Sequence, residues 1–268
     1  MSDPRGNRSS SRFITSVRAR AGNALPNCLF LALICVGCAG GMPSIPNAPE
    51  EILKKGEQYF QKGKYFQAQE LFKGFLARHP GHDKSDYAQF MLAETYFKEE
   101  EYPLAAVEYR VIVSDYGYSD YVDDAFFKEA VCSYQQAPKP QLDQTKSFEA
   151  YSRFKQFLQT FPNSPLVEEV NRYISLIHEK LARKDLLNAV FYMRRNHKDS
   201  AKIYLDKIIQ NYPGNDYWAK AMYYKGEMLL EGGDEEGAAS LFEEVLRYPR
   251  QLDVTARAKA ALSKLRNE

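Results

Sequence analysis

Residues 61–80 read QKGKYFQAQELFKGFLARHP, and this stretch decides the fold. Ala68 and Phe72 are four residues apart, about one helical turn, so they lie one above the other on one helix face. The small Ala68 lets a neighbouring helix approach closely, and the ring of Phe72 fills the space beside it. Pro80 cannot continue the helix and marks a turn. With Tyr59 nine residues before Ala68, on the preceding helix, the segment predicts two helices joined by a short turn.

The same spacing recurs four more times. Each copy has a bulky residue on its first helix, then an Ala, a bulky residue four positions later and a turn residue. In four of the five copies the Ala follows nine residues after the first landmark, whereas in the third it is seven residues late. The copies are Tyr59, Ala68, Phe72, Pro80; Tyr96, Ala105, Tyr109, Gly117; Tyr134, Ala150, Phe154, Pro162; Tyr192, Ala201, Leu205, Pro213; and Leu229, Ala238, Phe242, Pro249.

This repetition is typical of tetratricopeptide-type helix–turn–helix repeats, whose helices pack at fixed heights. It predicts an all-α tetratricopeptide-repeat superhelix, an α-solenoid of about five helix pairs. Residues 166–181 have apolar positions at spacings of three and four, which predicts an extra helix, and residues 254–265 predict a C-terminal capping helix. The alternative is an unrelated helical bundle in which Ala and Phe share these spacings by chance.

The first 37 residues differ in charge from the rest of the chain. They hold five Arg and one Asp, or +4, so a net charge of +1 leaves −3 for the remainder. This Arg-bearing start precedes an apolar run, LFLALICVG at residues 29–37, which is shorter than the roughly 20 residues that span a bilayer. The pattern predicts an export signal and gives no reason to expect binding to nucleic acid.

A small residue directly before Cys38 resembles the lipobox of bacterial lipoproteins, although Cys35 stands where that motif usually has Leu. The resemblance implies that Cys38 becomes the acylated first residue of the mature protein. Two acyl chains hold a protein firmly on a membrane, whereas one binds only marginally. Cys35 is a competing site but follows Ile34, and a plain secretory signal with incidental Cys residues is the alternative. Cys132 is then the one cysteine left unmodified, and no disulfide forms within the mature chain.

These features divide the chain into four predicted segments. They are a signal peptide at 1–37, a flexible tether at 38–50 with three Pro and two Gly between residues 40 and 49, repeats one to three at 51–165, and the extra helix, repeats four and five and the cap at 166–268. A polar insertion at 137–146 separates the two helices of the third repeat.

The residues indicate no catalytic chemistry. His79 and His82 lie in a turn beside Asp83, but no further ligand stands at a usual metal spacing. The sequence contains no phosphate-binding loop and no hydrolase motif. We therefore predict that the protein is a binding protein and not an enzyme, and that it holds no metal or other cofactor.

In tetratricopeptide stacks the first helix of each pair lines the inner groove, and aromatic residues dominate these positions in repeats one and two. Such a groove suits an extended peptide rich in apolar side chains. The alternative is that these aromatic rings pack the core. Counting from the landmarks also places Leu53 and Cys132 on this face. The predicted peptide-binding residues are Glu57, Phe60, Tyr87, Phe90, Glu94, Phe97 and Lys128.

The lipobox, the short tether, the five repeats, the insertion and the extra helix together resemble the BamD family of outer-membrane protein assembly factors. Residues 154–165 and 208–224 are similar to the inter-repeat turns of that family. The resemblance implies a lipoprotein on the periplasmic face of the outer membrane, attached by its lipid anchor alone. It also implies as partners the POTRA domains of the BamA barrel subunit, other lipoproteins of the assembly machine and C-terminal segments of unfolded outer-membrane proteins.

Two other classes share parts of this pattern. A soluble periplasmic repeat protein of the cell-division coordinator type has similar turns but no lipid anchor. A lytic enzyme with helical repeats would need a catalytic constellation, which the residues do not indicate.

Overall fold

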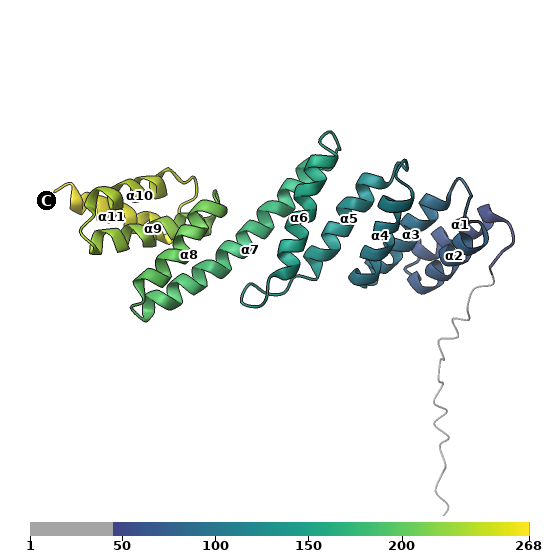
Figure 1. Cartoon of the computed structure of the whole chain (residues 1–268), viewed down its shortest axis with the longest axis horizontal. Helices are drawn as coiled ribbons and strands as arrows, with labels where there is room; N and C mark the ends of the chain where they lie inside the picture. The colour runs from purple at the N-terminus through teal and green to yellow at the C-terminus, as the bar shows by residue number, and fades with distance from the viewer. Residues whose placement is uncertain (1–44, 268) are drawn as a thin grey trace, which may run out of the picture. The chain divides into compact units, whose positions relative to one another are not determined.

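The computed structural model describes residues 45–267, which form eleven α-helices and no strand (Figure 1). The helices are α1 (Pro49–Gln61), α2 (Tyr65–Arg78), α3 (Ser85–Lys98), α4 (Tyr102–Asp115), α5 (Val122–Gln135), α6 (Thr145–Thr160), α7 (Val167–Arg194), α8 (Lys198–Asn211), α9 (Asp216–Glu231), α10 (Glu235–Arg247) and α11 (Asp253–Leu265). Each helix packs against the next in the chain, and α11 also contacts α9. The predicted tetratricopeptide-type α-solenoid of five helix pairs and a C-terminal helix is thus confirmed.

The repeat landmarks form the core of the pairs. All five landmark Ala residues are fully buried, and so are the five bulky residues that follow them one turn later: Phe72, Tyr109, Phe154, Leu205 and Phe242. The first helix supplies a complementary small residue three positions before its own landmark in four of the pairs, namely Gly56, Ala93, Ala189 and Gly226.

The closest approach occurs where that small residue is a glycine. A Cβ atom on Gly56 would lie 2.8 Å from Cε1 of Phe72, and one on Gly226 would lie 2.6 Å from Cε1 of Phe242. Carbon atoms in contact prefer about 3.5–4.0 Å, so each ring sits where any side chain on the facing helix would be. In these two pairs the position of the phenylalanine ring therefore requires a glycine on the facing helix.

The turn inside four of the pairs uses one residue in the left-handed region, four positions after the first landmark. These residues are Gly63, Glu100, Asn196 and Gly233, with φ between 59° and 83°. The equivalent position in the third pair is Pro138, whose ring fixes φ near −65°. Because Pro cannot adopt this turn, the third pair needs a longer connection, and residues 136–144 supply it between α5 and α6.

The predicted extra helix is not a separate element. Residues 167–181 continue without a break into the first helix of the fourth pair, giving α7 a length of 28 residues. The reason lies in the sequence, since no Gly or Pro stands between residues 166 and 194 to end the helix. Prediction of a helix here was correct, whereas its predicted end at Leu181 was wrong.

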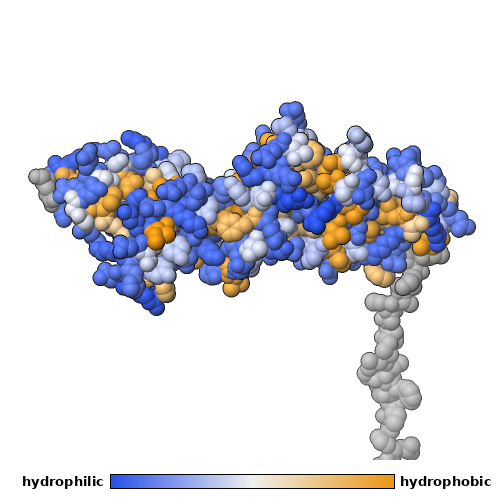
Figure 2. Space-filling view, viewed as in Figure 1, coloured by the Kyte–Doolittle hydropathy of each residue, from blue (hydrophilic) through white to orange (hydrophobic). Residues whose placement is uncertain are grey.

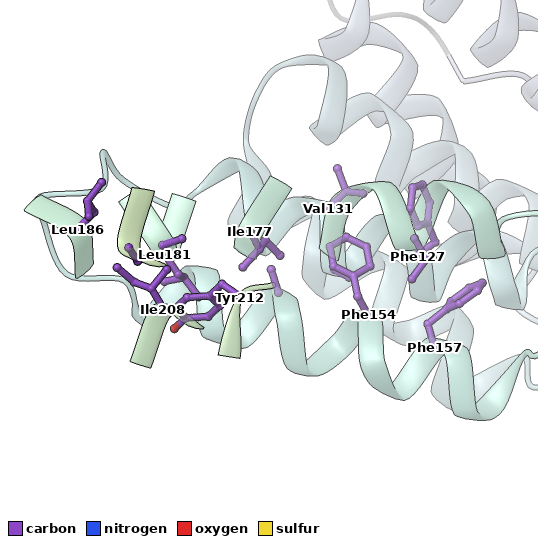
Figure 3. Packing of buried hydrophobic residues seen from close by; sticks show 14 of the residues in the cluster. Phe127, Val131, Phe154, Phe157, Ile177, Leu181, Leu186, Ile208 and Tyr212 are labelled. Carbon is purple, nitrogen blue, oxygen red and sulfur yellow. The ribbon is translucent and has the colours of Figure 1, made fainter. Parts of the chain in front are cut away.

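One buried hydrophobic cluster extends from α5 to α9. Figure 3 shows part of it, with Phe127 and Val131 facing Phe154 and Phe157, and with Leu181, Ile208 and Tyr212 gathered farther along. The cluster crosses residues 165–166, where we placed a boundary between two repeat groups. On the face shown in Figure 2, hydrophobic residues emerge in separate patches between hydrophilic ones.

The predicted tether differs from a free linker where the structure describes it. Helix α1 begins at Pro49, a residue that favours the first turn of a helix because its missing N–H needs no partner there. Ile45 packs on α2, where a Cβ on Gly74 would lie 2.7 Å from Cδ1 of Ile45. Arg78 donates a hydrogen bond of 3.1 Å to the carbonyl oxygen of Pro46. The chain is therefore held against α2 before α1 begins.

Candidate functional site

The seven residues predicted to bind peptide lie on the first helices of the first three pairs. Glu57 and Phe60 belong to α1, the next four residues to α3, and Lys128 to α5. All seven are half-buried: each has part of its surface in contact with neighbouring helices and part open to solvent. Two other positions that the same counting placed on this face, Leu53 and Cys132, are instead buried in the core.

The first contact of this set joins α1 to α3. The hydroxyl of Tyr87 donates a 2.7 Å hydrogen bond to Oε1 of Glu57. Burial, with this carboxylate adding to it, raises the pKa of Tyr87, so the hydroxyl stays protonated and remains a donor. Glu57 and Tyr87 thus form one polar link between the first and second pairs.

Aromatic contacts join α3 to Tyr121, the residue directly before α5. The ring of Phe90 stacks on Tyr121, with ring centroids 5.1 Å apart, and meets Tyr109 edge-on at 5.8 Å. Tyr87 also contacts Tyr121, at 5.8 Å. Such stacked and edge-to-face pairs are worth about 0.5–1.5 kcal/mol each beyond their buried area. These rings therefore stabilise the packing of neighbouring pairs, and those of Tyr87, Phe90 and Tyr121, unlike the buried Tyr109, are also partly exposed.

A charged group lies at the centre of the face. Glu94 accepts a hydrogen bond from the hydroxyl of Tyr109 and pairs with Nζ of Lys128 at 2.9 Å. The same ammonium group lies 4.6 Å from the ring centroid of Phe97, which itself meets Tyr102 edge-on. Burial and the Glu94 charge raise the pKa of the Tyr109 hydroxyl, which keeps it a donor. Glu94 and Lys128 thus compensate each other's charge between α3 and α5.

Prediction from the sequence missed Tyr121, which joins the rings of Tyr87 and Phe90. Tyr121 directly precedes α5, outside the helical positions counted from the landmarks. It does stand four residues before buried Ala125, on the same helical face, and this spacing was the available signal.

Cys132 is chemically inert in this setting. Its thiol is fully buried, and burial raises its pKa to about 12, so little reactive thiolate forms at neutral pH.

His79 and His82 pack with Phe75, with ring centroids 5.5 Å and 5.3 Å from the phenyl ring. Among residues 45–267, no three His, Cys, Asp or Glu side chains are arranged to hold a metal ion. Over the same residues, every helix is too short or too polar to cross a membrane.

Comparison with known protein families identifies the chain. The model of the YfiO family, described as an outer membrane lipoprotein, matches residues 46–251. The chain belongs to the YfiO family. The match covers all of the first ten helices, including both halves of α7.

Two relatives carry the name outer membrane protein assembly factor BamD. The protein from Rickettsia prowazekii is 24% identical over 224 residues, which cover 82% of this chain and 88% of the relative. The protein from Vibrio cholerae is 24% identical over 233 residues, covering 82% and 93% respectively. A tetratricopeptide-repeat protein from Bacteroides fragilis aligns with 83% of this chain and 99% of its own length, with a TM-score of 0.47 and 10% identity.

Membership of the YfiO family agrees with the resemblance to BamD that the repeats and the lipobox indicated. The proposed lipidation site, Cys38, and the predicted signal peptide lie outside the described residues. On the face formed by α1, α3 and α5, the aromatic rings of Phe60, Phe90 and Phe97 are half-buried, and the hydroxyls of Tyr87 and Tyr109 donate to the carboxylates of Glu57 and Glu94.

Proposed function

We propose that this protein is a lipid-anchored scaffold subunit of the machinery that assembles β-barrel proteins in the outer membrane. The observation that carries this proposal is the family match over residues 46–251 together with relatives named as assembly factors, which align over most of their own length. The role requires binding of other chains and needs no catalysis.

Unfolded outer-membrane protein segments are the proposed ligands of the α1, α3 and α5 face. A barrel strand alternates apolar and polar side chains with a period of two. Its apolar side chains fit the open edges of Phe60, Phe90 and Phe97, which are half-buried and project from successive first helices. Aromatic rings provide a large contact area and accept many apolar side chains, so they suit a ligand of variable sequence.

The polar groups of the face have a different part in this proposal. Glu57 and Glu94 already accept hydrogen bonds from tyrosine hydroxyls, and Glu94 is also paired with Lys128. Because the charge of Glu94 is compensated by Lys128 within the protein, a ligand needs no matching charge to bind beside this pair. Apolar contact then provides most of the affinity.

The C-terminal repeats four and five, from the second half of α7 to α10, are the proposed docking surface for the POTRA domains of the barrel subunit. Acylated Cys38 would hold the N-terminal pair near the membrane. Ile45 stands seven positions after Cys38, so the chain between them spans at most about 25 Å. Ile45 is itself fixed to α2 through Gly74, which limits how far the first pair can move from the bilayer.

A matched pair of substitutions tests the peptide face. Phe60 lies on α1 and contacts Tyr65, whereas Phe66 lies on α2 and has 49% of its side chain exposed. We expect Phe60→Ala to weaken binding of a labelled barrel-strand peptide about five- to tenfold, as loss of about 1–1.4 kcal/mol of apolar contact requires. Phe66→Ala should bind like the unaltered protein. Equal affinity for both variants, each shown to be folded by circular dichroism, would refute the assignment.

The wider role has its own test. Detergent extraction of the acylated protein from bacterial membranes, followed by affinity capture, should recover a barrel subunit that carries POTRA domains. Mass spectrometry of the captured chain should find acylated Cys38 as the first residue. A mature chain without acyl groups would instead favour a soluble periplasmic repeat protein, and capture without a barrel subunit would contradict the scaffold role.

A further inference from the structure

A hollow of about 320 Å³ lies on the second-helix side of the third and fourth pairs, away from the seven residues of the peptide face. Helices α6 and α8 form its two sides, and the N-terminal half of α7 forms its floor. The residues that line it include Phe148 and Tyr151 of α6, His178 and Leu181 of α7, Lys207 of α8, and Tyr212 directly after α8.

The walls of the hollow are aromatic and firmly packed. The ring of His178 lies between Tyr151, at 5.2 Å, and Tyr212, at 5.5 Å. Leu181 and Tyr212 are almost fully buried and gather with Ile208 in the core (Figure 3). Phe148, in contrast, stands at the rim with 49% of its side chain exposed. A rigid apolar floor with an exposed aromatic rim suits one large inserted side chain.

The lining of the hollow includes one lysine, Lys207, and no Asp or Glu. Nζ of Lys207 pairs with Asp185 at 2.9 Å but is 42% exposed, whereas the Asp185 carboxylate is only 4% exposed. Lys155, exposed on α6, is close enough to lower the pKa of His178 in addition to the larger effect of burial. The neighbouring carboxylate of Glu149 pairs with Lys146 at 2.6 Å. An incoming carboxylate would therefore meet the partly exposed ammonium group of Lys207 on the wall and that of Lys155 nearby, whereas Glu149 is held by Lys146.

We propose that this hollow binds a short extended segment of a partner protein in which a large aromatic side chain is flanked by acidic residues. The aromatic side chain would insert between Phe148 and Tyr212, and an adjacent carboxylate would lie near Lys155 and Lys207. This site is distinct from the α1, α3 and α5 face, because its two sides are formed by α6 and α8, the second helices of the third and fourth pairs. It gives the protein a second recognition surface with a different charge preference.

Three labelled peptides test this proposal: one with a central Trp between two Asp residues, one with Lys in place of both Asp residues, and one with Ala in place of Trp. Binding to the full mature chain is measured by fluorescence anisotropy. We expect the Trp–Asp peptide to bind at least tenfold more tightly than either of the others. Equal binding of the Asp and Lys peptides, or no binding of the Trp–Asp peptide at all, would overturn the proposal.

Variants locate the binding. Phe148→Ala should weaken the Trp–Asp peptide about five- to tenfold, and Lys155→Glu should weaken it further and reduce its dependence on salt concentration. Phe66→Ala removes an equally exposed ring on α2 and should have no effect. Normal binding by a folded Phe148→Ala variant would overturn the proposal. The two proposals fail separately, because the barrel-strand peptide test depends on Phe60 and this one on Phe148.

Discussion

Glu129 is a buried carboxylate held by two arginines, and this arrangement predicts an unusual response to substitution. It lies on α5 with only 3% of its surface exposed. Arg110 of α4 donates to Oε1 at 2.9 Å and 2.7 Å, and Arg153 of α6 donates to Oε2. The Arg153 guanidinium also lies 4.6 Å from the ring centroid of Phe126. The carboxylate of Glu129 therefore links α5 to both α4 and α6.

The two arginines should not contribute equally. Arg110 is 63% exposed, so solvent screens its charge, and Arg110→Met should cost about 1–2 kcal/mol, the value of a charged hydrogen bond. Arg153 is only 28% exposed and adds its contact with Phe126, so Arg153→Met should cost about 2–3 kcal/mol. The double variant leaves Glu129 buried without a cation. Breaking a buried pair in this way costs about 3–5 kcal/mol.

Urea unfolding followed by far-UV circular dichroism measures these free energies. The double variant should also become more stable as pH falls, because an unpaired buried carboxyl binds its proton more tightly in the folded chain than in the unfolded one. Adding Glu129→Met to the double variant should recover most of the lost free energy of unfolding. Three apolar side chains of similar volume then replace the triad, and the unpaired buried charge of Glu129 is gone. A double variant within about 1 kcal/mol of the unaltered protein, with no rescue by Glu129→Met, would refute this account.

Three further predictions follow from single sites. Gly226→Ala should lower the free energy of unfolding by up to about 2 kcal/mol, because overpacking against Phe242 outweighs the gain of about 1 kcal/mol in helix propensity. Thermal melting measures this loss, and Phe242→Leu in the same chain should compensate for it. Gly74→Val should displace the end of Ile45 without disturbing the core, so limited proteolysis should cleave before α1 faster while the melting temperature stays nearly constant. Burial lowers the pKa of His178 below its ordinary value of 6.5, and the charge of Lys155 adds to this effect. Between the pKa of His178 in the folded chain and that in the unfolded chain, the unfolded chain binds more protons. Stability therefore falls as pH drops below neutrality. The His178→Gln variant should lose less stability than the unaltered chain between about pH 7.5 and pH 5.5, as measured by urea unfolding at each pH.

The sequence was sufficient to predict the pairing of helices because the repeat spacing is a packing rule. Ala68 and Phe72 lie where a second helix must be small and then bulky, and the same two positions are fully buried in all five pairs. The position four residues after the first landmark holds a left-handed turn residue in four of the five pairs. Its occupation by Pro138 in the third pair explains the one long insertion.

The sequence could not separate core from face among the first-helix positions. Periodicity gives the side of a helix on which a residue lies. It does not show how much of that residue the next helix pair covers. Leu53 and Cys132 are enclosed by that approach, whereas Phe90 remains half open because Tyr121 covers one side of its ring. Tyr121 comes from a turn in the neighbouring pair, and no pattern within one repeat specifies that contact.

The length of α7 connects the irregular part of the repeat array with the second proposed site. The other first helices have 13 to 16 residues, whereas α7 has 28. Its added N-terminal portion carries His178 and ends close to Leu181, and both side chains line the hollow between α6 and α8. A first helix of ordinary length would begin near residue 180 and leave this floor unbuilt. The continuous run without Gly or Pro that prevented a break at Leu181 is thus also what places an aromatic hollow, with Lys207 on its wall, between the third and fourth pairs.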